Sequence, residues 1–261
     1  MPNLALVIDL SNLSARAYFA AKQGKEDQSV IGLARHNLIK MTKTVLRECD
    51  PLRILVACDG DGPTFRHELY APYKAGRSEK DAEYSLLQHA APAILAEEFG
   101  AEVYASPGFE ADDVIACLAD QMLPYGFRTV VLSSDADLHQ LVTETGGGAG
   151  TYQLRYESGT YRVVDVKTVT EKFKVPPHRV ALAKALMGDS GDGYPGVASV
   201  GPVAAARLAN QFPSVGAMYA NLDKIASKGD RSKLEAAGET HALLMYRLAA
   251  LRLDAPLQRV L

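Results

Sequence analysis

Four short apolar runs, each bounded by turn-forming residues, predict four buried β-strands. They lie at residues 4–8, 53–58, 102–105 and 129–132. Between them, apolar residues recur at helical spacing, which predicts helices near residues 30–46, 82–99 and 112–122. Strands that alternate with helices are typical of parallel βαβ units. The pattern therefore predicts an α/β fold with a mostly parallel central sheet flanked by helices.

The pattern changes in the second half of the chain. Two alternating runs at residues 151–156 and 161–164 flank Ser158-Gly159, which predicts a β-hairpin. From Asp165 onward, short apolar stripes are interrupted by glycine and proline, which predicts a series of short helices. We therefore expect an α/β core at residues 1–164 and a smaller helical region at residues 165–261.

The composition is that of a globular protein, because 48% of the 261 residues are hydrophobic and 23% are charged. No run approaches the roughly 18 apolar residues of a membrane helix, and the first residues lack the basic flank of a signal peptide. We therefore expect a cytoplasmic protein without a membrane partner. Cys49, Cys58 and Cys117 show no CxxC spacing, which favours reduced thiols over disulfides or zinc ligands.

Each predicted strand is followed closely by carboxylates. Asp9 follows the first strand and Asp59 follows the second. The third and fourth are followed by Glu110, Asp112, Asp113, Asp135 and Asp137. In a parallel sheet the carboxyl ends of the strands share one edge. A single acid there would be interpreted as a helix N-cap, but seven carboxylates at one edge repel one another, so we expect cations among them.

The residue types at these positions indicate which cation to expect. Oxygen ligands without histidine or cysteine favour magnesium or manganese over zinc. Two such ions, about 3.5–4 Å apart, can activate a water and stabilise the departing oxygen of a phosphodiester. Asp189 and Asp192 add two more acids among glycines, although alone they would be interpreted as a polar turn.

The net charge does not exclude a nucleic-acid partner. The chain has 28 basic and 31 acidic residues, a net charge of −3, which at first argues against phosphate binding. If nine of the acids bind metal, the 28 basic residues face 22 remaining acids, and the rest of the chain has a net charge of +6. The local distribution of charge matters more than the total.

Several motifs follow one another in a specific order. They are Val7-Ile-Asp9 with Arg16 and Tyr18; Asp59 with Thr64-Phe-Arg66; Tyr73-Lys74 with Arg77; Glu110-Ala-Asp-Asp113; Ser133-Ser-Asp-Ala-Asp137 with Gln140-Leu141; and Met187-Gly-Asp-Ser-Gly-Asp192 through Pro195-Gly-Val197 to Gly201. The ordered set resembles the 5′-nucleases, the family of bacterial and phage flap endonucleases and of the 5′-3′ exonuclease domain of bacterial DNA polymerase I. The resemblance covers nearly the whole chain and implies a PIN-like core. Because no polymerase domain follows Leu261, we expect the stand-alone form.

The resemblance implies that nine carboxylates hold divalent metal, either Mg²⁺ or Mn²⁺, with two or more ions. They are Asp9, Asp59, Glu110, Asp112, Asp113, Asp135, Asp137, Asp189 and Asp192. Asp59, Glu110 and Asp112 would bind mainly one ion. Asp137, Asp189 and Asp192 would bind mainly the other ion, and Asp135 would lie between the two ions.

The resemblance also implies a helical arch within about residues 60–90, a flexible element under which a 5′ single strand passes. Its expected DNA contacts and catalytic cations are Arg66, Tyr73, Lys74 and Arg77. The Tyr73 ring would stack on a base, and Lys74 and Arg77 would stabilise charge at the scissile phosphate. Without the family match this stretch would be interpreted as a solvated charged loop. Arg16 is expected to contact a phosphate, with a surface salt bridge as the alternative.

Residues 186–212 resemble the helix-hairpin-helix element of the family. Gly196, Ser199 and Gly201 would let backbone amides approach a duplex phosphate, and the family often holds a potassium ion there. A hairpin used only for packing is the alternative. Pro202, Val203 and Ala204 stand where the family usually carries a lysine and a threonine, which predicts weaker anchoring of the duplex.

Together these features predict a structure-specific, divalent-metal-dependent 5′-nuclease, a 5′-3′ exonuclease or flap endonuclease. We expect a monomer that cleaves DNA with 5′ flaps or 5′ ends and leaves 5′-phosphate and 3′-hydroxyl ends; an RNA–DNA hybrid is a further candidate substrate. One alternative is a non-catalytic DNA-junction binding protein of the same fold. Another is a magnesium phosphohydrolase for small monoesters. A dinucleotide-binding enzyme is disfavoured because no glycine-rich turn follows the first strand.

Overall fold

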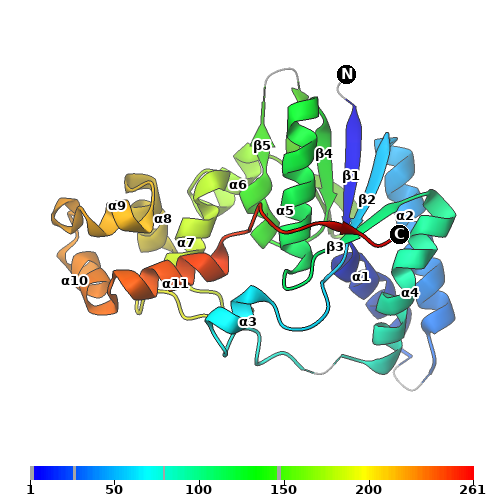
Figure 1. The fold of residues 1–261 in the computed structure, drawn as a ribbon, viewed down its shortest axis with the longest axis horizontal. Helices are drawn as coiled ribbons and strands as arrows, with labels where there is room; N and C mark the ends of the chain where they lie inside the picture. Colours follow the sequence, from blue (N-terminus) through cyan, green and yellow to red (C-terminus); the bar gives the residue numbers. More distant parts are fainter. Residues whose placement is uncertain (1–2, 26–27, 79, 146–147) are drawn as a thin grey trace. The chain divides into compact units, whose positions relative to one another are not determined.

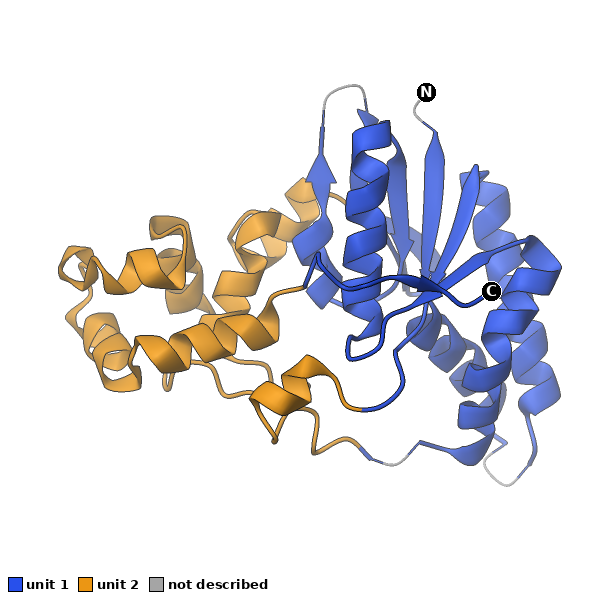
Figure 2. Cartoon of the chain, viewed as in Figure 1, with its two compact units in different colours: residues 1–62, 78–164, 252–261 blue, residues 63–77, 165–251 orange. Residues whose placement is uncertain are grey.

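The computed structural model describes residues 3–25, 28–78, 80–145 and 148–261. The chain forms two compact units (Figure 2). The first comprises residues 1–62, 78–164 and 252–261, and the second comprises residues 63–77 and 165–251. Two segments differ from the predicted division. Residues 63–77 belong to the helical unit instead of the α/β core, and residues 252–261 return to the α/β unit instead of ending the helical region.

The first unit is built around an eight-stranded sheet with the order β5-β6-β4-β1-β2-β3-β8 and β7 paired to β6 (Figure 1). The strands are β1 Leu4–Asp9, β2 Arg53–Ala57, β3 Glu102–Ala105, β4 Arg128–Leu132, β5 Thr143–Glu144, β6 Gly150–Glu157, β7 Thr160–Val164 and β8 Gln258–Arg259. β1 is parallel to β2 and β4, β2 is parallel to β3, and β4 is parallel to β6. The predicted, mostly parallel sheet is confirmed, so the carboxyl ends of β1 to β4 share one edge.

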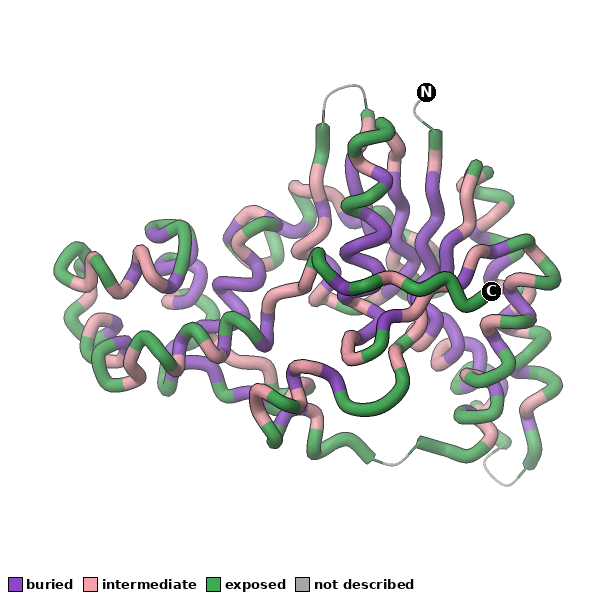
Figure 3. Tube along the Cα trace, in the orientation of Figure 1, coloured by how far each residue is buried: buried purple, intermediate pink, exposed green. Residues whose placement is uncertain are grey.

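Four helices cover this sheet. They are α1 Leu10–Lys22, α2 Ile31–Cys49, α4 Ala82–Phe99 and α5 Ala111–Met122. α1, α2 and α4 pack together on one face, where their apolar side chains join Leu6, Ile8 and Val56 in the core. α5 packs on the opposite face against β1 to β4. Residues 5–8 of β1 are fully buried because both faces of the strand are covered (Figure 3).

The second unit consists of short helices. They are α3 Phe65–Leu69, α6 Val166–Phe173, α7 Val180–Met187, α8 Pro202–Gln211, α9 Val215–Tyr219, α10 Lys228–Ala237 and α11 Glu239–Ala249. α11 packs against α3, α7, α9 and α10. Of the predicted helical arch only α3 is helical before α4 begins, since residues 70–78 and 80–81 form turns and irregular backbone; Glu79 lies outside the described residues. Within the described ranges, none of the helices is long and apolar enough to cross a membrane.

A compact turn at residues 188–201 joins α7 to α8. Gly196 has φ +67, and a Cβ atom there would lie 2.3 Å from the backbone nitrogen of Gly188, so only glycine fits. Ser199 also adopts a positive φ, of 63. Pro202 occupies the start of α8, where its missing N–H removes no helical hydrogen bond. The predicted hairpin segment is therefore two helices joined by a tight turn.

Candidate active site

The predicted carboxylates of the first unit lie at the shared edge of the parallel strands. Asp9 is the last residue of β1, and Asp59 follows β2 by two residues. Glu110 caps the helix that follows β3, with Asp112 and Asp113 in the first turn of that helix. Asp135 and Asp137 follow β4. The parallel pairing of β1 to β4 thus brings together side chains that are more than 120 residues apart in the sequence.

Asp9 is buried, and its pKa is strongly raised. Its Oδ1 accepts a hydrogen bond from the backbone N–H of Asn12 at 3.0 Å, and Asp9 thereby caps the start of α1. Its Oδ2 accepts a hydrogen bond from Ser133 Oγ at 2.7 Å. Burial, more than the nearby charges of Asp135 and Asp59, raises the pKa of Asp9 to about 6. Burial therefore makes the ionised form of Asp9 less stable than that of an exposed aspartate, and a cation beside it would offset this cost.

Replacing Asp9 with asparagine is expected to stabilise the metal-free protein at pH 8 by on the order of 1–3 kcal/mol. The folded-state pKa of about 6 exceeds the ordinary 3.8, so ionisation destabilises the fold progressively as the pH rises from about 4 to about 6. Asparagine keeps an acceptor for Asn12 and has no charge. Urea unfolding in chelator at pH 8 and pH 4 tests this. If Asp9→Asn is equally more stable than the wild type at pH 4, where Asp9 is protonated, then the buried charge is not the cause of the gain.

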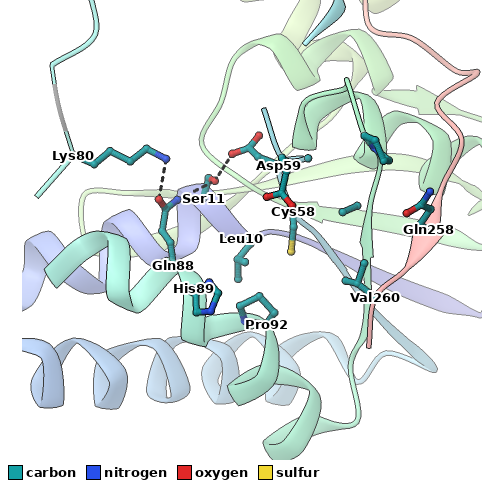
Figure 4. Close-up of a pocket in the computed structure, with 14 residues that line it drawn as sticks. Leu10, Ser11, Cys58, Asp59, Lys80, Gln88, His89, Pro92, Gln258 and Val260 are labelled. Carbon is teal, nitrogen blue, oxygen red and sulfur yellow. Dashed lines mark hydrogen bonds between the residues drawn. The ribbon is translucent and has the colours of Figure 1, made fainter. Parts of the chain in front are cut away.

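Asp59 is exposed, yet both of its oxygens accept hydrogen bonds. Oδ1 accepts from the backbone N–H of Ala111, the first residue of α5, at 3.0 Å, and Oδ2 accepts from Ser11 Oγ at 2.9 Å. The residue borders a cavity of about 520 Å³, which the close-up in Figure 4 shows. Beside it, burial and then the charges of Asp59 and Asp9 raise the pKa of Cys58 to about 12, so this thiol stays protonated.

Glu110 and Asp113 form a capping box at the start of α5. The Glu110 side chain accepts from the backbone of Asp113, and Asp113 Oδ2 accepts from Glu110 N at 3.3 Å. Asp113 Oδ1 accepts from Arg252 N at 2.9 Å, and the residue is 0% exposed. Asp113 therefore fixes the helix start and the returning chain, and its role as a metal ligand stays a prediction. Asp112, partly exposed in the same turn, keeps its predicted role as a hypothesis.

Two residues that the sequence interpretation missed shape the loop after β4. The hydroxyl of Ser133 donates to Asp9 and accepts from Asp135 N at 3.0 Å. Gln153 on β6, which is 1% exposed, donates from Nε2 to the backbone oxygens of Ser133 and Asp135. Asp135 Oδ1 in turn accepts from Asp137 N at 2.8 Å. The alternating run gave no signal for Gln153, because its burial follows from the pairing of β6 with β4 and β7.

The donor set of the sheet edge fits a hard divalent cation, because it consists of carboxylates that are close enough to raise the pKa of Asp9. Among the described residues, no three histidine, cysteine, aspartate or glutamate side chains form a group that could hold an ion. Magnesium binds through one or two carboxylates and keeps several waters. The carboxylates of this edge are thus of the ligand type that such an ion prefers.

The remaining two predicted acids lie in the second unit, where basic side chains neutralise them. Lys184 Nζ, buried, lies 2.7 Å from Asp189 Oδ2. Burial acts to raise the pKa of Asp189, but the Lys184 ammonium and backbone N–H groups hold it below its usual value. Asp192 Oδ1 accepts from Arg77 at 3.0 Å and lies 3.8 Å from Lys74 Nζ. The two predicted catalytic cations therefore share one carboxylate.

Two residues predicted to contact DNA lie in the core of the second unit, and their predicted contacts stay hypotheses. The Tyr73 ring is 2% exposed, packs with Tyr194 and Met245, and donates its hydroxyl to Asp192 Oδ2 at 3.0 Å, so it offers no open face to a base. Arg66 is also 2% exposed, and its guanidinium donates to the backbone oxygens of Leu248 and Ala250. Both residues are buried because they contact α11 or the backbone that follows it.

Arg16 and the hairpin residues keep their predicted roles as hypotheses. The Arg16 guanidinium lies 4.1 Å from the centre of the Tyr156 ring and donates to Tyr161 Oη at 3.4 Å, so it makes cation–π contacts instead of the alternative surface salt bridge. Its side chain is half-buried and borders a groove of about 450 Å³ that also contains Lys40.

Comparison with known proteins identifies the family. Its two profiles cover the chain: "5'-3' exonuclease, N-terminal resolvase-like domain" matches residues 4–174 and "5'-3' exonuclease, C-terminal SAM fold" matches residues 175–261. The chain is 34% identical to the thermostable DNA polymerase I of Thermus filiformis over 98% of its own length, and it spans 29% of that polymerase. It is 32% identical to the flap endonuclease Xni of Shewanella sediminis, over 98% of this chain and 94% of that protein.

Solved structures agree on the fold. The flap endonuclease of bacteriophage T5, in a pseudo-enzyme–product complex with DNA and metal ions, matches with a TM-score of 0.73 at 18% identity, over 95% of this chain and 89% of that chain. At this identity the likeness concerns the architecture alone. The family profiles and the near full-length match to a flap endonuclease carry the assignment: the chain belongs to the 5′-3′ exonuclease family.

Proposed function

We propose that this protein is a divalent-metal-dependent 5′-nuclease that hydrolyses DNA phosphodiester bonds and leaves 5′-phosphate and 3′-hydroxyl ends. The observation that carries the proposal is the carboxylate edge of the first unit, where burial and neighbouring acids raise the pKa of Asp9 to about 6. Such a cluster is stable at neutral pH when cations neutralise it. The flap endonuclease relative and the 5′-3′ exonuclease family profile support the same activity.

Magnesium or manganese is the proposed cofactor. The side chains proposed to hold it in the first unit are Asp9, Asp59, Glu110, Asp112, Asp113, Asp135 and Asp137. Bound ions would activate a water and stabilise the departing oxygen of the phosphodiester. Asp189 and Asp192 are proposed to join the ligand set when substrate and metal are bound. Within the second unit, Lys74 and Arg77 would then leave Asp192 and stabilise the negative charge that grows on the phosphate.

The proposed substrate is DNA with a 5′ flap or a 5′ end, recognised by its shape. The relative from bacteriophage T5 was solved with DNA, and the tight turn between α7 and α8 offers backbone N–H groups to a duplex phosphate. A potassium ion at this turn remains part of the proposal. Val203 at the start of α8 is 79% exposed and carries no charge, which supports weaker anchoring of the duplex than a lysine would give.

A double-flap DNA labelled at the 5′ end of its flap tests the proposal. With Mg²⁺ we expect cleavage near the junction and a nicked product that DNA ligase can seal, because joining to the upstream 3′-hydroxyl needs a 5′-phosphate on the cleaved strand. With chelator we expect no cleavage. Binding without cleavage under both conditions would instead favour a junction-binding protein, and hydrolysis of a chromogenic phosphate monoester without flap cleavage would favour a monoesterase. Cleavage of the same substrate with an RNA flap of equal length measures the preference for DNA.

A further inference from the structure

A continuous chain of hydrogen bonds leads from the exposed Lys80 to the carboxylate of Asp59 (Figure 4). Lys80 Nζ donates to Gln88 Oε1 at 2.9 Å, Gln88 Nε2 donates to Ser11 Oγ at 3.2 Å, and Ser11 Oγ donates to Asp59 Oδ2 at 2.9 Å. The four residues, here called the relay, come from separate segments: the loop before α4, α4 itself, α1, and the loop after β2. All of them belong to the first unit.

The two ends of the relay fix the direction of every bond between them. An ammonium group has only donors, and a carboxylate has only acceptors. Gln88 must therefore present its oxygen to Lys80 and its NH₂ group to Ser11. The Ser11 hydroxyl accepts from Gln88 and has a single hydrogen, which it gives to Asp59. Each polar group is thus satisfied in one arrangement, and that arrangement orients the Asp59 carboxylate.

This orientation matters because Asp59 is an exposed side chain beside a solvent-filled cavity of about 520 Å³. An exposed aspartate without partners samples several rotamers, and ordering it on binding costs conformational entropy. Asp59 is held from two sides, by Ser11 and by the backbone N–H of Ala111. A carboxylate that is already oriented binds a cation more tightly than a mobile one, since less freedom is lost.

We propose that Ser11 and Gln88 are positioning residues that orient Asp59 for metal binding, and that Lys80 fixes the amide of Gln88. The inference rests on the proposed function, in which Asp59 is a metal ligand. It adds two uncharged residues, on α1 and α4, to the machinery of the site. It also links the chain segment that precedes α4 to the carboxylate edge of the sheet.

Metal binding by the full, DNA-free chain tests the relay. We expect Ser11→Ala to raise the dissociation constant for Mn²⁺, measured by isothermal titration calorimetry, by about 10-fold, the lower end of the effect of removing an outer-shell partner. Gln88→Leu is expected to have a smaller effect in the same direction. Ser11→Thr keeps the hydroxyl and is expected to retain wild-type affinity. Alanine and leucine are good helix formers, so α1 and α4 should be retained.

Two comparisons separate a relay from general damage. The double variant Ser11→Ala/Gln88→Leu is expected to bind Mn²⁺ no more weakly than Ser11→Ala alone, because Gln88 acts through Ser11. Gln121→Leu, at an exposed position of α5 outside the relay, is the matched control and should leave the affinity unchanged. Unchanged Mn²⁺ binding in Ser11→Ala, or losses that add in the double variant, would overturn the inference.

Asp59→Asn distinguishes failure of the relay from failure of the proposed function. If Asp59→Asn binds Mn²⁺ and cleaves a flap like the wild type, Asp59 is not a metal ligand and both proposals fail at this residue. If Asp59→Asn is impaired while Ser11→Ala and Gln88→Leu bind Mn²⁺ normally, the relay alone is refuted. In the supported case, the relay variants need more metal for half-maximal cleavage and recover near wild-type kcat when metal is saturating.

Discussion

Replacing Asp135 with asparagine is expected to lower the single-turnover rate of flap cleavage by about 10³-fold, the upper end of the loss for one electrostatic stabiliser. Asparagine keeps the Oδ1 atom that accepts from Asp137 N at 2.8 Å, so the turn after β4 is retained while one negative ligand is lost. Rapid-quench kinetics at saturating Mg²⁺ measure this rate. DNA binding in chelator, measured by fluorescence anisotropy, should be unchanged or tighter because one carboxylate no longer repels phosphate.

A matched control separates this effect from a general change of charge. Asp120→Asn alters an exposed carboxylate in the last turn of α5 and should leave the cleavage rate within about twofold of the wild type. Asp135→Ala should be at least as impaired as Asp135→Asn, because it also removes the acceptor for Asp137. Wild-type cleavage by Asp135→Asn would rule out Asp135 as a ligand of the reacting ions.

Replacing Lys74 with alanine is expected to lower the same single-turnover rate by about 10²-fold or more, as for the loss of one group that stabilises developing charge. The structure supports a specific role, because Lys74 is tightly positioned. Its φ is +55, its backbone N–H donates to Asp192 O at 2.9 Å, and its side chain is 14% exposed. The equilibrium affinity for DNA should change far less than the rate, because the ammonium acts mainly on the transition state.

Lys167→Ala is the control for the loss of a single positive charge. Lys167 lies on α6 with an 81% exposed side chain and pairs only at 3.9 Å with Glu171, so its removal should leave the rate nearly unchanged. If Lys74→Ala also cleaves at the wild-type rate, then Lys74 does not stabilise the transition state, and its contact with Asp192 is structural.

The regular part of the fold could be predicted from periodicity. The predicted bounds of β3 and α4 coincide with the observed ones, and β1, β2 and β4 differ from prediction by one residue at one end. The position of the acids followed from the same pattern, since an acid directly after a buried strand of a parallel sheet must lie at the shared edge. Local sequence sufficed because strand alternation and helix stripes are local properties.

The burial of Arg66, Tyr73 and Asp113 depends on contacts between distant parts of the chain. Arg66 and Tyr73 stand in a polar, charged stretch that is typical of exposed loops. Arg66 is buried because its guanidinium meets the backbone of Leu248, 182 residues further along. Asp113 looks like its acidic neighbours in sequence, and besides its local capping box with Glu110 it accepts from the backbone N–H of Arg252, 139 residues away. No local pattern contains these pairings.

The return of residues 252–261 to the first unit has a consequence for how the protein is made. β8 pairs with β3, Val103 exchanges backbone hydrogen bonds with Val260 and Leu261, and Ser106 Oγ donates to Pro256 O at 3.1 Å. On the ribosome, the β3 edge therefore stays open until residues 252–261 have emerged. A nascent chain stalled before residue 252 would expose an unpaired strand, a known route to aggregation.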